Sequence, residues 1–327
     1  MKAIVIREPG GPDVLELREV PDPEVPHNHV RVRVVAAGVN RADLLQRAGH
    51  YPAPPGAPRD IPGLEYAGTV ETIGSGVTRY RVGDRVFGLV PGGAYAELLV
   101  VHERELAPIP AGLSDLEAAA VPEAFITAYD ALMVRGRLAP GERVLVHAAG
   151  SGVGTAAIQV ARALGCFVVG TSRTDDKLSR CRALGMNAGV VPAKGAFAKQ
   201  VLDATSGRGV DVVIDLVGGD YVAESIAACA SRARLVLVGL TGGLSATLGL
   251  GAVLQKRLEI VGTVLRARPL EEKIAAAELL AKNLSPWLAE GRVKPVVDRT
   301  FPFSEAAAAH AYVAENGSFG KVMLQIG

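Results

Sequence analysis

Hydrophobic positions change their rhythm about a third of the way along this chain of 327 residues. In the first third, short apolar runs alternate with turn signals rich in glycine and proline, such as residues 9–12, 74–76 and 91–93. This rhythm is typical of a small β-barrel rather than of a parallel sheet. The predicted strands are 2–7, 14–20, 30–35, 66–73, 85–89 and 95–101, with a short helix at 41–48 and a proline-rich loop at 51–62.

From about residue 123 onward, apolar strands alternate with helical patterns, which predicts a doubly wound parallel sheet. Its strands are 143–147, 167–171, 189–191, 210–216, 234–240 and 258–263, and its helices are 151–164, 175–184, 197–204 and 221–230. Helices at 270–288 and 304–314, with strands at 296–301 and 321–326, follow and are expected to return to the first domain. We therefore predict an α/β chain with one domain at 1–122 plus 265–327 and another at 123–264.

The first turn of the predicted parallel sheet consists of small residues from Ala149 to Gly154. Small residues let the backbone turn tightly and approach a ligand, and the N–H groups at a helix start attract a diphosphate. The turn therefore indicates a dinucleotide cofactor, nicotinamide or flavin. Its spacing departs from G-x-G-x-x-G, because Thr155 follows Gly150 and Gly152. An ordinary tight turn between strand and helix is the alternative interpretation.

The end of the second parallel strand indicates which nucleotide is favoured. An acidic residue at this strand end would bind the ribose hydroxyls of NAD. The sequence has Ser172 and Arg173 there instead. Ser172 offers a hydroxyl to a 2′-phosphate, while Arg173 and Lys177 offer positive charge, so the pattern favours NADPH. A solvated helix face is the alternative for Arg173 and Lys177. We assign Asp175 and Asp176 to the first helical turn, where acids favour the helix dipole.

Composition narrows the class of protein further. The net charge is +1 with no basic run, so we expect no nucleic-acid partner. No apolar run reaches membrane-spanning length and no signal peptide is evident, so we expect a soluble, cytoplasmic protein. The three cysteines and six histidines lack disulfide or metal-ligand spacing, and there is no G-x-S-x-G motif. Such a chain fits redox chemistry that the cofactor carries.

Several short motifs resemble one family. They are Asn40-Arg41-Ala42-Asp43, Val121-Pro122-Glu123-Ala124 and Gly262-Thr263-Val264-Leu265-Arg266, together with segments 61–68, 82–86, 211–219 and 320–324. Over essentially the whole chain the sequence resembles the zinc-free quinone oxidoreductases of the medium-chain dehydrogenase/reductase superfamily, zeta-crystallin-like and nearest the p53-inducible type. The resemblance implies a GroES-like β-barrel catalytic domain and a Rossmann domain that binds NADPH.

The zinc-dependent members of that superfamily carry a cysteine where Asn40 stands and a histidine where Leu64 stands. Leucine cannot bind zinc and a neutral amide is a poor ligand, so the resemblance implies a site without metal. A simple ketone would then lack charge stabilisation during reduction. Quinones and electron-poor alkenes spread the developing charge themselves, and we expect the small-molecule substrate to be one of these.

The resemblance, together with the positions at strand ends, implies roles for individual residues. Asn40 would orient substrate or a water, or else serve as a turn residue, and Tyr51 would bind quinone or cofactor, or else pack its loop. For Lys321 an ordinary exposed lysine is the alternative to cofactor binding. Besides Ser172, Arg173 and Lys177, the expected cofactor contacts are Thr127, Ser151, Gly152, Val153, Leu216, Val217, Gly239, Leu240, Thr241, Val264, Leu265, Arg266, Asn316 and Lys321.

Three functions follow from these expectations. The first is an NADPH-dependent quinone oxidoreductase, and the second an NADPH-dependent reductase of α,β-unsaturated carbonyls. The third is an NADPH-binding protein with a structural or RNA-binding role, for which the charge balance offers no support. A homodimer is expected from the family and from the apolar runs 235–240 and 258–261, where edge strands of two copies would pair.

Overall fold

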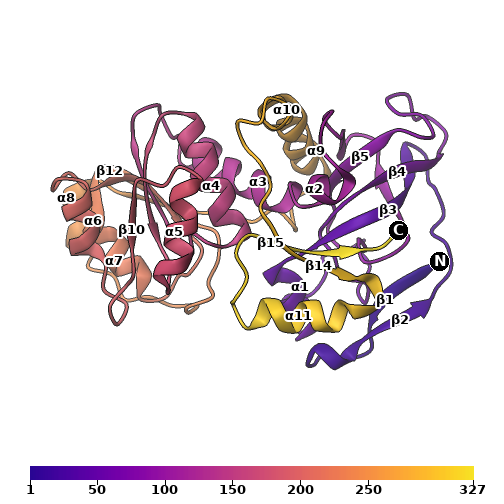
Figure 1. Cartoon of the computed structure of the whole chain (residues 1–327), viewed down its shortest axis with the longest axis horizontal. Helices are drawn as coiled ribbons and strands as arrows, with labels where there is room; N and C mark the ends of the chain where they lie inside the picture. Colours follow the sequence, from indigo (N-terminus) through magenta and orange to yellow (C-terminus); the bar gives the residue numbers. More distant parts are fainter. The chain divides into compact units, whose positions relative to one another are not determined.

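The computed structural model describes residues 1–327, and the chain divides into two compact units (Figure 1). The first, which we call the β-rich unit, comprises Met1–Ile126, Leu265–Gly291 and Pro295–Gly327. The second, the parallel-sheet unit, comprises Thr127–Val264 and Arg292–Lys294.

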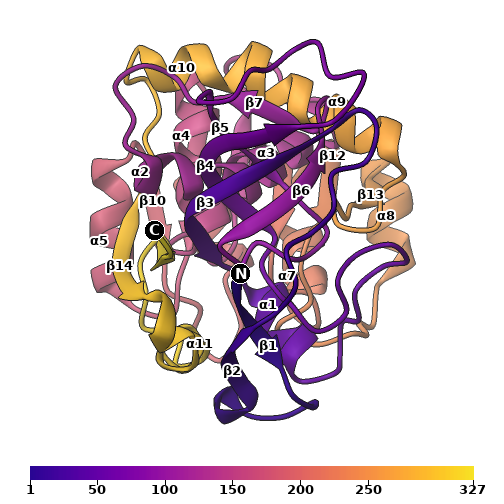
Figure 2. The same cartoon turned by 90° about the vertical axis from the view of Figure 1, so that its right-hand side faces the viewer.

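A seven-stranded sheet and a two-stranded sheet form the β-rich unit. In the larger sheet the strand order is β14-β15-β3-β4-β5-β7, with β6 also paired to β3, and β3, β4 and β5 run side by side in Figure 2. The strands are β1 (Lys2–Ile6), β2 (Leu15–Glu19), β3 (His29–Val39), β4 (Glu65–Ile73), β5 (Arg85–Leu89), β6 (Leu98–His102), β7 (Leu106–Pro108), β14 (Val297–Pro302) and β15 (Lys321–Gln325). The helices are α1 (Arg41–Arg47), α2 (Asp115–Ala119), α9 (Leu270–Leu279), α10 (Ser285–Ala289) and α11 (Ala306–Ala314), and α3 (Pro122–Tyr129) begins in this unit.

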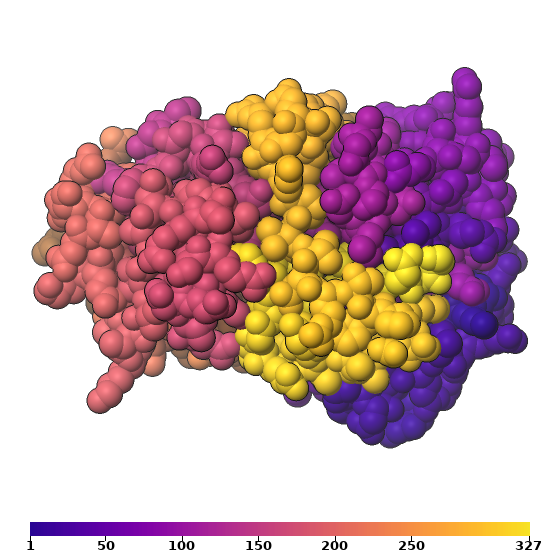
Figure 3. Space-filling view, viewed as in Figure 1, coloured from indigo at the N-terminus to yellow at the C-terminus, as the bar shows by residue number.

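The last strand of the chain returns to the middle of the β-rich unit. β15 pairs antiparallel with β3, so that Val322 lies opposite Val39 and Met323 opposite Gly38. In Figure 3 the C-terminal atoms, drawn in yellow, lie against the indigo atoms of the N-terminal segment. Val322, Met323 and Leu324 of β15 are all buried, as are the residues of β3 that they face, so this pairing lies within the core. The register places Lys321 beside the end of β3.

The six strands of the parallel-sheet unit have the order β10-β9-β8-β11-β12-β13, and every neighbouring pair is parallel. In chain order this is 3-2-1-4-5-6, the order of a Rossmann fold. The strands are β8 (Arg143–Val146), β9 (Phe167–Thr171), β10 (Ala188–Val190), β11 (Val210–Asp215), β12 (Cys229–Leu237) and β13 (Glu259–Gly262). The helices are α4 (Gly152–Ala163), α5 (Asp175–Ala183), α6 (Ala198–Ala204), α7 (Tyr221–Ala228) and α8 (Leu250–Lys256).

His147 is the buried polar centre of the parallel-sheet unit. Its Nδ1 lies 2.8 Å from Thr171 Oγ1 and its Nε2 2.8 Å from Ser225 Oγ, and its ring packs against Phe197 and Tyr221. Burial lowers the pKa of His147 to about 3, so the imidazole is neutral at physiological pH. The histidine therefore links β8, β9 and α7 through structural hydrogen bonds.

The predicted α/β class and the two kinds of domain are confirmed, but several element boundaries were wrong. The predicted helix 270–288 is interrupted by a π-helical turn at Leu280–Leu284, just before Pro286, which lacks a backbone N–H. The predicted strand 234–240 begins earlier and ends earlier, as β12. Helix α8 was missed because Gly249 and Gly251, at its start, are turn signals in the sequence. The short elements β7 and α2 were missed as well.

Candidate active site

The start of helix α1 fixes the first polar groups of the site. Asn40 is the N-cap of α1, and its backbone N–H donates to Asp43 Oδ2 at 2.8 Å. Asp43 Oδ1 accepts from the backbone N–H of Gly63 at 3.1 Å, which ties the helix to the segment before β4. Asn40 therefore begins a helix, and its side chain is directed to other polar groups.

That side chain joins a buried ion pair. The Lys321 ammonium, 4% exposed, pairs with the Glu65 carboxylate, 0% exposed, and also donates to Asn40 Oδ1. Asn40 Nδ2 donates to Glu65 Oε1 at 3.0 Å, while Glu65 Oε2 accepts the backbone N–H of Glu123 at 2.7 Å. The three side chains therefore satisfy one another, and we call them the Lys321 cluster. The alternative of an exposed lysine at position 321 is wrong, because the register of β15 on β3 carries it inward.

Gly38 makes room for this cluster. A Cβ at that position would lie 2.0 Å from Glu65 Oε1, so no side chain fits on β3 at this point. The glycine lets the carboxylate of β4 lie directly over the neighbouring strand.

A series of buried polar side chains leads from Asp43 away from the Lys321 cluster. Tyr95 donates its hydroxyl hydrogen to Asp43 Oδ2 at 3.3 Å, and His310 Nε2 lies 3.2 Å from the same hydroxyl. On the far side, Arg47 donates to His310 Nδ1 at 3.4 Å, so His310 carries its hydrogen on Nε2. Burial and the charge of Arg47 lower the pKa of His310 to about 3, and burial raises the pKa of Asp43 to about 6.

Arg266 organises the loop that carries Tyr51. Its guanidinium donates to the carbonyl oxygens of Pro91 at 2.7 Å and Tyr51 at 3.1 Å, and to Gln46 Oε1 at 2.5 Å. It also lies over the Tyr51 ring, 5.0 Å from the ring centre. Arg266 is buried, whereas the Tyr51 ring is half-buried. The structure thus brings two of the predicted site residues together within the β-rich unit.

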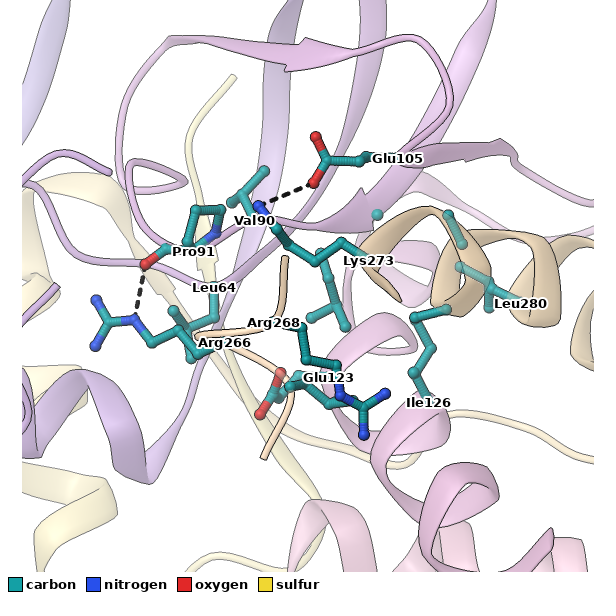
Figure 4. Close-up of a pocket in the computed structure, with 15 residues that line it drawn as sticks. Leu64, Val90, Pro91, Glu105, Glu123, Ile126, Arg266, Arg268, Lys273 and Leu280 are labelled. Carbon is teal, nitrogen blue, oxygen red and sulfur yellow. Dashed lines mark hydrogen bonds and ion pairs between the residues drawn. The ribbon is translucent and has the colours of Figure 1, made fainter. Parts of the chain in front are cut away.

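A pocket opens beside these groups in the same unit (Figure 4). Its volume is about 490 Å³, which includes the open solvent at its mouth. Leu64, Val90 and Ile126 give it an apolar wall, Arg266 and Arg268 add positive charge, and Glu123 adds a carboxyl group. Across the pocket, Glu105 pairs with Lys273 at 3.3 Å.

In the parallel-sheet unit, the small-residue turn forms an N-terminal helix site at α4. Ser151 is the N-cap, and its Oγ accepts the backbone N–H of Gly154 at 3.0 Å. The N–H groups of Gly152 and Val153 precede the first i→i−4 hydrogen bond of the helix, so they are directed outward. A Cβ on Gly154 would lie 2.5 Å from the Ala148 carbonyl oxygen, so glycine is required for the helix to approach the strand. This cradle fits a diphosphate.

The other expected nucleotide contacts lie at the carboxyl ends of the parallel strands or beyond. At the end of β9, Ser172 is buried, Arg173 is exposed and Lys177 is half-buried on α5. Asp215 ends β11, and its Oδ1 accepts the N–H groups of Val217 at 2.8 Å and Gly218 at 2.9 Å, which shapes the following turn. The remaining expected nucleotide contacts near the ends of parallel strands are Leu216, Val217, Gly239, Leu240, Thr241 and Val264.

Three expected contacts stand apart from that edge of the sheet. Thr127 is buried inside helix α3. Leu265 lines the pocket of the β-rich unit. Asn316 follows α11 and accepts a hydrogen bond from Arg41 while its Nδ2 donates to Ala314 O at 2.9 Å. Sequence reasoning missed Glu65 and Glu123 as site residues, although both stood inside quoted motifs as carboxylates among apolar neighbours.

The Lys321 cluster does not fit a zinc ion. Leu64 offers no donor atom, and both amide atoms of Asn40 are engaged by Glu65 and Lys321. The Lys321 ammonium already supplies the positive charge beside Glu65. No group of three or more His, Cys, Asp or Glu side chains is arranged to hold a metal ion.

Comparisons with known proteins agree with this architecture. Residues 26–111 match the alcohol dehydrogenase GroES-like domain, and residues 152–282 match the zinc-binding dehydrogenase family. A quinone oxidoreductase of Pseudomonas aeruginosa is 36% identical over 323 residues, with 96% of each chain covered. The chain belongs to the quinone oxidoreductase-like branch of the medium-chain dehydrogenase/reductase superfamily.

Two further relatives show how broad that branch is. A 2-haloacrylate reductase of Burkholderia sp is 32% identical over 330 residues, covering 98% of each chain. The crystal structure of a protein described as an NAD-dependent alcohol dehydrogenase has a TM-score of 0.89 at 34% identity, with both chains fully covered. The protein is therefore an oxidoreductase of small molecules that uses a nicotinamide cofactor, built from a GroES-like and a Rossmann domain.

No helix of this structure has the length and apolar character needed to cross a membrane.

Replacing Lys321 with methionine tests the buried ion pair. Lys321→Met leaves the Glu65 carboxylate buried without its counter-charge. We therefore expect the free energy of unfolding of the β-rich unit to fall by about 3–5 kcal/mol. The single tryptophan, Trp287, lies in this unit, so its fluorescence in a denaturant titration reports the loss. The double variant Glu65→Gln with Lys321→Met should recover about 1 kcal/mol or more, since the unpaired charge is gone.

Lys273→Met is the matched control, because its pair with Glu105 is partly exposed, and it should cost no more than about 1 kcal/mol. An equal fall in the free energy of unfolding for Lys321→Met and Lys273→Met would contradict the view that the buried pair stabilises the β-rich unit.

Proposed function

We propose that the chain is an NADPH-dependent quinone oxidoreductase that transfers a hydride to its acceptor without a metal. The observation that carries this proposal is the Lys321 cluster, in which an ammonium and a neutral amide stand where a metal centre would need donor atoms. An acceptor at such a site has no Lewis acid to polarise it, so it has to spread the incoming charge through its own conjugation. Quinones meet this requirement.

NADPH is the proposed cofactor because basic and hydroxyl groups follow β9 where a 2′-phosphate would lie. Ser172, Arg173 and Lys177 would hold that phosphate. Asp175 and Asp176 lie in the first turn of α5, where Thr174 is the N-cap, so they complement the helix dipole. The bound cofactor would supply the hydride, and the protein would bind and orient it.

We assign the diphosphate to Ser151, Gly152 and Val153 through their backbone N–H groups at the start of α4. The proposed contacts with the rest of the nucleotide are Thr127, Leu216, Val217, Gly239, Leu240, Thr241, Val264, Leu265, Arg266, Asn316 and Lys321. For Arg266 and Lys321 the support is indirect, because the donor groups of both side chains are engaged by partners within the β-rich unit. The two residues would therefore act by shaping the wall of the site. Asn40 and Tyr51 would orient the acceptor.

Electron-poor alkenes are the second candidate substrates. The support is the 2-haloacrylate reductase among the relatives, whose name describes an alkene conjugated to a carboxylate. The same absence of metal donors favours such acceptors, because a carbonyl or carboxylate in conjugation takes up the charge. The two candidates differ in the acceptor alone and use the same cofactor.

A homodimer is proposed on the free edge of the parallel sheet. β13 pairs with β12 on one side, and its outer edge has no partner strand within the chain. Nearby leucines on and before α8 are largely exposed, Leu244 by 86%, Leu250 by 73% and Leu254 by 79%. An unprotected edge beside such a surface favours pairing with the same edge of a second copy.

Steady-state assays of NADPH oxidation with a panel of quinones and enals test the activity directly. We expect kcat/KM for the best quinone to exceed that for the best enal by about tenfold or more. A reversed ratio would favour the alkene reductase. NADPH binding without turnover of any acceptor would contradict both and leave a binding or structural role.

The double variant Arg173→Ala with Lys177→Ala tests the cofactor. Loss of two charge-assisted contacts should weaken NADPH binding by about 100-fold or more, with NADH binding nearly unchanged. Arg180→Ala, on the exposed face of the same helix, is the control and should affect neither nucleotide. Equal weakening of both nucleotides in a calorimetric titration would remove the 2′-phosphate assignment.

Ile260→Lys tests the dimer by placing a charge on β13. Sedimentation should show twice the 33.9 kDa chain mass for the wild type and a monomer for the variant. Leu270→Lys is the matched control, since Leu270 is exposed by 42% and Ile260 by 37%, and it should remain dimeric. A monomeric wild type would contradict the proposed edge pairing.

A further inference from the structure

Glu123 has a backbone held in place by a hydrogen bond and a side-chain carboxyl group that has no hydrogen-bond or ion-pair partner. It is the second residue of α3, and its backbone N–H donates to Glu65 Oε2 at 2.7 Å. Its side chain turns to the pocket of the β-rich unit, where Leu64 and Ile126 lie beside it (Figure 4). Neither a hydrogen bond nor an ion pair engages its carboxyl oxygens, and burial is the main influence on the group.

The surroundings of Glu123 favour its neutral form. Burial raises its pKa to about 8, and the negative charges of Glu65 and Asp43 act in the same direction, against the positive charges of Lys321 and Arg266. At neutral pH the carboxyl therefore holds a proton. The titratable and charged groups that face the pocket or its wall are Asp43, Tyr51, Glu65, Glu105, Arg266, Arg268, Lys273 and Lys321.

The other acids of this region are committed to structural contacts. Asp43 is 0% exposed, and its two oxygens accept the N–H groups of Asn40 and Gly63. Glu65 is bound to Lys321, and Glu105 pairs with Lys273. Glu123 thus differs from its neighbours in having a proton to give and in lining the pocket with a carboxyl group that no partner engages.

The proposed reaction needs such a group. When a quinone accepts a hydride, the C–H bond of the donor breaks with its electron pair and the acceptor becomes a hydroquinone anion. That anion resembles a phenolate, whose pKa is about 10, so it takes a proton readily from a carboxylic acid with a pKa about two units lower. Where the two groups are not in contact, a water bound in the pocket would relay the proton.

We propose that Glu123 is the proton donor of the reaction, passing its carboxyl proton to the acceptor oxygen directly or through one water in the pocket. This role rests on the proposed function. The O–H bond of Glu123 breaks as the O–H bond of the hydroquinone forms, and the resulting carboxylate regains a proton from solvent. Each turnover then consumes one hydride and one proton, which balances the reduction of a quinone to a hydroquinone.

Glu123→Gln tests the role through the pH profile of turnover. Above about pH 8 the wild type should lose activity, because Glu123 is deprotonated before the acceptor arrives. The variant should turn over about 100-fold more slowly at pH 7, with little change in KM, and should lack the fall near pH 8. Glu123→Asp should restore part of the rate, because it returns a titratable carboxyl. Glu105→Gln, which keeps a hydrogen-bond partner for Lys273, should behave as the wild type.

Protein stability gives an independent readout of the same carboxyl. A folded-state pKa above the unfolded value near 4.5 means that the stabilising contribution is complete below about pH 4.5 and is lost as the pH rises through about 8. Trp287 fluorescence should therefore show that Glu123→Gln loses less stability than the wild type between pH 5 and 9.

Three outcomes separate the claims. A slow variant without the fall near pH 8 supports the proton donor. An active wild type matched by Glu123→Gln in rate and pH profile overturns the donor and leaves the quinone reductase standing. A wild type that reduces neither quinones nor enals overturns the proposed function and the donor with it.

Discussion

The buried pair of Glu65 and Lys321 is the interaction on which the site depends. A carboxylate with no solvent contact is tolerable only beside a compensating charge, and the chain brings that charge from a residue 281 positions beyond Asn40. Pairing of β15 with β3 delivers it, and Gly38 leaves the space in which the carboxylate lies. The C-terminal segment is therefore part of the site as much as part of the sheet.

This pair also explains the character of the groups around it. The charge of Glu65 helps to keep Glu123 protonated, while the Lys321 ammonium restrains that effect. Asn40 bridges the two partners with both atoms of a neutral amide and begins helix α1 with its backbone. A positive charge, a neutral amide engaged at both of its atoms and a protonated acid thus occupy one region, and in these states all three are poor ligands for a metal ion. Such a site suits acceptors that carry their own conjugation.

Much of the fold could be predicted from local pattern. Alternation of apolar strands with helices predicted the parallel sheet, and the small residues from Ala149 to Gly154 predicted the start of α4. The polar site was harder, because its members meet through pairing that sequence spacing does not reveal. Lys321 was expected to contact the cofactor, yet its burial follows from the register of β15 on β3. The position of Glu123 in the site depends on the hydrogen bond between its backbone and Glu65, which lies on another element. Helix α8 was missed for a local reason, since the glycines at its start indicate a turn.

The central claim is that the Lys321 cluster replaces a metal centre. Its most direct measurement is acceptor turnover before and after exhaustive dialysis against a zinc chelator, with metal content determined on both samples. The account predicts an unchanged turnover number and no stoichiometric zinc in either sample. Loss of activity on chelation, with recovery when zinc is added back, would contradict it.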